Sequence, residues 1–161
     1  MVSPATVAGD VVTKLRAIGT LATAIDAPFN TADPPVRVST TLIKAYADDE
    51  TTHRSLAEAI GAIATGEILV GYMGLGLGAR GEISGWVHQI GIFWKPKSET
   101  QTSAIIAAIA TGTPTGSSVA LPYCQINTAL DPMDDISFTR AANADGIEYW
   151  TCTFTLAEVW G

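Results

Sequence analysis

The sequence predicts an α+β domain in which an antiparallel or mixed β-sheet is flanked by helices and carries a long glycine-rich β-hairpin. Residues 3–25 place apolar side chains at steps of three and four, which is the period of an amphipathic helix. Residues 67–73 and 82–94 are rich in β-branched and aromatic residues and enclose a glycine-rich stretch. Strands that follow one another through hairpins pair antiparallel, with the helices on one side of the sheet.

Three segments have a helical period, and each has a residue at its start that can cap a helix. They are residues 3–25 with Ser3, residues 50–64 with Asp48 or Asp49, and residues 99–111 with Ser98. Pro4 at the first helical position strengthens the first of these starts. Residues 26–35 are rich in proline and predict a connector.

Six segments have the composition or the alternation of β-strands. They are residues 36–42, 67–73, 82–94, a strand within 121–130, 136–140 and 147–159. Alternation in 82–94 places one set of large side chains on a single face: Trp86, His88, Ile90, Ile92 and Trp94. In the last strand, the face that carries Trp150, Cys152, Phe154 and Leu156 is expected to point into the core.

The composition indicates a single folded domain over residues 1–161. Apolar residues make up 47% of the chain and charged residues 16%, which excludes a disordered chain and is low for the surface of a monomer. Two explanations stay open: other subunits cover much of the surface, or the surface is rich in Ser, Thr, Gly and Ala. The net charge of −7 and the scattering of the nine Lys and Arg residues argue against a module that grips nucleic acid.

The glycine-rich stretch, residues 74–81, contains the pattern G-x-G-x-x-G. A dinucleotide-binding loop of this pattern would open a helix whose N-terminus holds the phosphates, whereas the residues that follow here predict a strand. The stretch is therefore predicted to be a flexible hairpin tip. Leu75 and Leu77 on this tip would be exposed unless something docks on them, with Arg80 and Glu82 at the rim. These four residues form a candidate interface.

No cofactor, metal or catalytic group is predicted. His53 and His88 lack metal-ligand spacing, and no nucleophile motif is present. Cys124 and Cys152 read as buried free thiols, with a disulfide between neighbouring strands as the alternative. A rival hypothesis, a small cytoplasmic enzyme that uses Cys152 or His88 in a pocket, requires a solvent-reachable thiol with a lowered pKa. No secretory signal and no membrane span are expected.

Two acidic clusters and a terminal tryptophan complete the candidates. Residues 48–50 predict a helix cap, and Asp131 with Asp134 and Asp135 predicts a hairpin tip. For either cluster the functional alternative is an acidic lining that faces DNA or a basic partner. Trp160 is expected to anchor against a neighbouring subunit.

Taken in order, these elements resemble a known protein family. The resemblance is carried by a helix TVAGDVVTKLRAIGTL, a strand EILVGYMG, the glycine-rich loop, a strand SGWVHQIGIFWKP, a helix SETQTSAIIAAIA and a closing strand DGIEYWTCTFTLAEVW. This order is similar to tail terminator (tail completion) proteins of long-tailed bacteriophages. Residues 30–66 depart from the family and read as an insertion.

The resemblance implies a structural virion protein that is not an enzyme. It implies a hexameric ring at the head–tail junction, which caps the tail tube, ends its elongation and offers the surface that joins the head. Its partners would be other copies of the chain, the tail tube protein and head–tail connector proteins, with assembly in the host cytoplasm. DNA would pass through the ring without specific binding. The alternatives are a head–tail connector ring protein and a binding domain whose partner adds a strand to the 74–85 hairpin.

Overall fold

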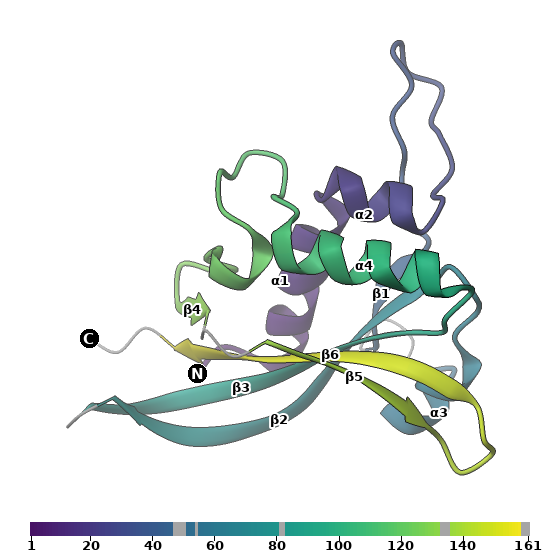
Figure 1. The fold of residues 1–161 in the computed structure, drawn as a ribbon. Helices are drawn as coiled ribbons and strands as arrows, with labels where there is room; N and C mark the ends of the chain where they lie inside the picture. Colours follow the sequence, from purple (N-terminus) through teal and green to yellow (C-terminus); the bar gives the residue numbers. More distant parts are fainter. Residues whose placement is uncertain (47–50, 54, 81–82, 133–135, 159–161) are drawn as a thin grey trace.

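A computed structural model describes residues 1–46, 51–53, 55–80, 83–132 and 136–158. It shows a curled sheet with three helices on one face and a short helix on the other (Figure 1). The helices are α1 (Pro4–Arg16), α2 (Gly19–Ala24), α3 (Leu56–Ala62) and α4 (Glu99–Thr111). The strands are β1 (Ile43–Ala45), β2 (Ile68–Arg80), β3 (Ile83–Trp94), β4 (Leu130–Pro132), β5 (Ser137–Ala142) and β6 (Glu148–Glu158).

Within the described residues the sheet has six strands and is mixed, so the predicted α+β class is confirmed. Its order is β1-β2-β3-β6-β4, and β5 pairs with another part of β6. Only β1 and β2 pair in parallel; the other described pairs are antiparallel. The long strands β3 and β6 form the centre of the sheet, and their register places Ile92 opposite Cys152.

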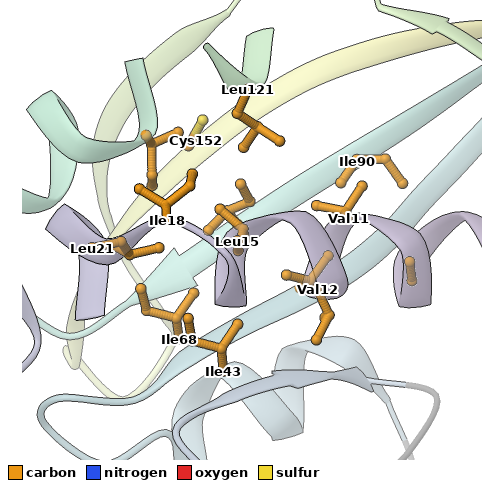
Figure 2. Close-up of a cluster of buried hydrophobic side chains, with 14 of the residues drawn as sticks. Val11, Val12, Leu15, Ile18, Leu21, Ile43, Ile68, Ile90, Leu121 and Cys152 are labelled. Atoms are coloured by element: carbon orange, nitrogen blue, oxygen red, sulfur yellow. The ribbon is translucent and has the colours of Figure 1, made fainter. Parts of the chain in front are cut away.

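The main core lies between α1, α2, α4 and the sheet. Val11 and Leu15 of α1 point toward Ile90 of β3 and toward Cys152 of β6, and all four are fully buried (Figure 2). The side of β6 that was predicted to face the core therefore does so. On the opposite face, α3 covers a smaller cluster that includes Leu69 and Phe93, which corrects the prediction that all helices lie on one side.

The predicted helix 3–25 is broken in two. Ser3 caps α1 as expected, because its Oγ accepts a hydrogen bond from the Thr6 N–H at 3.2 Å. The helix ends at Arg16, and the extended backbone of Ile18 leads into α2. The Arg16 guanidinium donates to the carbonyl oxygens of Ile43 and Thr40, at 2.6 and 2.8 Å. Tertiary contacts thus hold the end of α1 on β1, although the apolar period continues across the break.

Three other boundaries differ from the prediction. The strand expected at 36–42 is replaced by β1 at Ile43–Ala45. The second helix is shorter than 50–64 and is capped by Ser55, whose Oγ accepts from the Glu58 N–H at 3.2 Å; Asp48 and Asp49 lie outside the described residues. The region 121–130 forms a 3-10 turn and only reaches a strand at Leu130.

Gly9 offers a test of how α1 is stabilised. Glycine in a helix interior costs conformational entropy, and a Cβ at this position would meet nothing within 4 Å. We expect Gly9→Ala to raise the free energy of unfolding by roughly 0.5–1 kcal/mol, measured by urea denaturation. A decrease in the free energy of unfolding would contradict this expectation, because it would show that the added methyl group meets other atoms in solution.

Candidate functional site

Strands β2 and β3 extend beyond the rest of the sheet as a two-stranded ribbon. Their register runs from Leu69–Phe93 to Arg80–Ile83, whereas the pairing of β3 with β6 reaches only Val87. The ribbon projects at the lower left of Figure 1. We call residues 74–80 and 83–87 the arm. The glycine-rich residues 74–80 are thus strand residues rather than the loop that was predicted.

A β-bulge sits at the base of the arm. Tyr72 and Gly74 pair with consecutive residues of β3, which leaves Met73 as the extra residue. Because side chains alternate along a strand, the extra residue shifts the alternation by one. Leu75 and Leu77 therefore lie on the same face of the sheet as Tyr72, which packs against the main core.

The arm has one apolar face and one face that is rich in glycine. Leu75, Leu77 and Trp86 share the apolar face and are 40%, 75% and 39% exposed. On the other face β2 presents glycines at positions 74, 76 and 78, and β3 presents Val87 and Gly85 beside them. A two-stranded ribbon is marginally stable in water, and clustered exposed apolar side chains mark docking sites. The apolar face of the arm is therefore the candidate functional site.

A buried polar network holds the base of the arm. The His88 side chain is fully buried; its Nδ1 lies 2.6 Å from the Tyr72 hydroxyl oxygen and its Nε2 lies 2.9 Å from Glu158 Oε1. The same carboxylate oxygen accepts a hydrogen bond from the Val2 N–H at 2.7 Å. The network thus ties β2 and β3 to the end of β6 and to the segment before α1.

The network perturbs the two acidic groups that it contains. Burial alone would raise the pKa of Glu158, but the hydrogen bonds from the Val2 N–H and from His88, together with the positive charge of the N-terminal amine, outweigh it and hold the pKa below its ordinary value. Burial raises the pKa of Tyr72, and the negative charge of Glu158 raises it further. At neutral pH the network therefore contains a carboxylate and a neutral phenol.

This lowered pKa predicts a pH dependence. A carboxyl group whose pKa is lower in the folded state stabilises the fold above its unfolded pKa, and that stability is lost as the pH falls through the folded value. We expect the free energy of unfolding to fall as the pH drops below about 4.5. Urea denaturation across pH 3–7 measures the effect, with Glu158→Gln as the control. Parallel curves for the two proteins would contradict the assignment to Glu158.

The predicted interface residues fall into two groups. Leu75 and Leu77 lie together on the apolar face of the arm, and Arg80 is the last residue of β2, paired with Ile83. Glu82, Asp134, Asp135 and Trp160 lie outside the described residues. Sequence reasoning missed Trp86 as a site residue and placed it on the face of 82–94 that carries the core residues. Trp86 does share the face of the core residues, but β3 has already extended beyond the core where Trp86 lies. Only the pairing of Trp86 with Leu77 places it on the arm.

The thiols do not have the properties that the enzyme hypothesis requires. Cys152 is fully buried, and burial raises the pKa of its thiol to about 12, whereas a nucleophile needs access and a lowered pKa. Cys124 is also buried, and it follows the 3-10 turn rather than lying in a strand. Both cysteines are free, which excludes the alternative of a disulfide between them.

Within the described ranges, no group of three or more His, Cys, Asp or Glu side chains is placed to hold a metal ion. A surface cavity of about 840 Å³ between α2 and α4 is lined mainly by threonine and alanine. No helix among the described residues is long and apolar enough to cross a membrane.

The sequence of the chain was compared with models of known protein families and with curated protein sequences, and it matches none of them.

Proposed function

We propose that the chain is the subunit of a hexameric ring at the head–tail junction of a long-tailed bacteriophage, where it acts as the tail terminator. The ring would cap the tail tube, end its elongation and offer the surface to which the head joins. The observation that carries the proposal is the arm, because its exposed apolar face needs another chain to cover it. The order of helix, paired long strands, helix and closing strand supports it, since the resemblance rests on that order.

The face of the sheet opposite the main core suits a surface along which DNA moves without binding. Gln89, Ser137, Thr153 and Thr155 line a shallow hollow of about 360 Å³ there, together with apolar side chains. These groups are polar and uncharged, so they offer no cations to neutralise phosphates. The net charge of −7 acts in the same direction, because it repels DNA.

The mass of the purified protein tests the proposal. Light scattering across a range of concentration and salt is expected to show a discrete species of six times the 16.8 kDa chain mass. Electron microscopy should then show this species on one end of purified tail tubes. A protein that stays monomeric in every condition and leaves tube ends bare would contradict the proposal. Binding to filled heads but not to tubes would assign the chain to the connector alternative.

A further inference from the structure

A second projection lies far from the arm. Residues 27–38, which we call the finger, leave the fold between α2 and β1 and project at the upper right of Figure 1. The finger is ordered by its own hydrogen bonds: the Asn30 N–H donates to the Val36 carbonyl at 2.8 Å, and the Val38 N–H donates to the Pro28 carbonyl at 2.8 Å. The Asn30 side chain also accepts from the Val36 N–H at 2.9 Å. The predicted connector is therefore a structured ribbon.

The finger presents a fixed aromatic side chain to solvent. Phe29 is 59% exposed and Val36 is 57% exposed. The Arg37 guanidinium lies 4.3 Å from the centre of the Phe29 ring. It is itself held by hydrogen bonds to Asp26 Oδ1 at 3.0 Å and to the Ala27 carbonyl at 2.8 Å. A side chain that is ordered before binding loses less entropy on docking, so Phe29 is built as an anchor.

Most of the exposed apolar side chains lie on the two projections. Nine large apolar side chains are exposed in the described part of the chain, and six of them lie on the finger, the arm or the base of the arm: Phe29, Val36, Met73, Leu75, Leu77 and Trp86. The finger and the arm lie at opposite ends of the molecule (Figure 1), so the two apolar surfaces cannot cover each other within one chain. Each requires a surface from another molecule.

We infer that the finger of one copy docks on the apolar face of the arm of the next copy, with Phe29 and Val36 against Leu75, Leu77 and Trp86. This inference rests on the proposed ring, and it names the two surfaces that build it. A contact between two different surfaces is head-to-tail and forms a ring when the rotation between neighbours closes, or an open filament when it does not, whereas a contact between identical surfaces stops at a dimer. The pairing of one apolar projection with another leaves neither exposed.

Charge favours a second copy as the occupant. Each chain carries a net charge of −7, so two copies repel each other over most of their surfaces. Residues 71–79 contain no charged side chain. On the finger the Arg37 charge is balanced by Asp26, which leaves the negative charge of Asp33; Arg80 at the end of β2 carries the opposite charge. Copies can therefore approach through these two surfaces with little repulsion.

The size of the contact predicts weak pairing and cooperative closure. A few aromatic and aliphatic side chains on two ribbons bury less than the roughly 1,200–2,000 Å² of a stable pairwise interface. In a ring each copy makes two such contacts, and the last one forms within a single assembly. Rings should therefore appear sharply with concentration, with few intermediate species.

Two single variants and their mixture test the inference. Phe29→Ser removes the anchor of the finger, and Leu77→Ser removes the most exposed side chain of the arm; both sites are exposed, so the fold should persist. Each variant alone should raise the assembly midpoint concentration by more than about tenfold. Val119→Ser, at an exposed apolar residue on neither projection, is the matched control and should assemble as the wild type does. Circular dichroism and thermal melting verify folding.

A mixture of the Phe29→Ser and Leu77→Ser variants tests whether the finger of one copy docks on the arm of another. The Leu77→Ser copy keeps an intact finger and the Phe29→Ser copy keeps an intact arm, so an equal mixture should form a 1:1 heterodimer. Because a single contact is weak, sedimentation velocity should be run at concentrations well above the midpoint at which wild-type rings form. A second pair, Val36→Cys mixed with Leu77→Cys, should cross-link between chains under mild oxidation. Rings that survive both serine variants would overturn the inference and leave the ring proposal standing. Loss of rings without a heterodimer or cross-link would also overturn it, and a wild type that never self-associates would contradict both proposals.

Discussion

Replacement of Gly112 by alanine is expected to lower the free energy of unfolding by about 3 kcal/mol. Gly112 caps the end of α4, and its N–H donates to the Ala108 carbonyl at 2.9 Å. A Cβ at this position would overlap that carbonyl oxygen and would lie 2.6 Å from Cγ2 of Ile18. The Ile18 side chain is fully buried at the break between α1 and α2, so it has no space into which it can shift.

Urea denaturation monitored by tryptophan fluorescence measures this effect. Gly9→Ala is the matched control, because it is the same substitution at a site where the new methyl group has room, and it should change stability in the opposite direction. A decrease of less than about 1 kcal/mol for Gly112→Ala would mean that the end of α4 can move away from Ile18.

Replacement of His88 by alanine is expected to destabilise the fold by about 3 kcal/mol. The ring is fully buried, so its removal leaves a cavity, and it deprives the Tyr72 hydroxyl and the Glu158 carboxylate of a shared partner. Because the network lies where the arm leaves the sheet, we also expect faster amide hydrogen exchange in residues 72–76 and 87–90.

Tyr72→Phe separates the contribution of the hydrogen bond from the contribution of filling the space that the His88 ring occupies. It keeps the aromatic ring and removes only the hydroxyl, so it should cost about 1 kcal/mol. If Tyr72→Phe and His88→Ala lowered the free energy of unfolding equally, the packing of the His88 ring would contribute nothing to stability. Unchanged exchange in the arm of the His88→Ala variant would show that the network does not hold the base of the arm.

Elements with strong local signals were predicted correctly. The third predicted helix, 99–111, matches α4 because Ser98 caps it in the expected way, accepting from the Gln101 N–H at 3.1 Å. The long strands β3 and β6 were recognised because alternation over eleven or more residues is hard to mistake. Their buried faces follow from the same alternation.

Elements defined by tertiary contacts were not predicted. The break after Arg16 leaves the apolar period intact, and it depends on hydrogen bonds to carbonyls that lie far along the chain. The segment 36–42 has a strand-like composition, yet pairing with β2 selects the residues that follow it, Ile43–Ala45. Local composition carries no information about which edge a neighbouring strand will offer.

The candidate site was partly visible in the sequence. Two leucines among glycines indicate exposure, and this prediction identified Leu75 and Leu77. The finger gave no such signal, because its order arises from the stacking of Arg37 on Phe29 and from the turn around Asn30. Residues six to eight positions apart make these contacts, and neither a helical nor a strand period detects them.

The bulge at Met73 determines on which side of the subunit a neighbour can sit. If Met73 paired as an ordinary strand residue instead of bulging, every later residue of β2 would shift by one position, and Leu75 and Leu77 would rotate to the surface where Gly74 and Gly76 now lie. The composition, the charge and every side chain would be unchanged, yet the apolar face of the arm would point the opposite way. The polarity of any assembly built through the arm is therefore encoded by one backbone irregularity rather than by the chemistry of the contacting side chains.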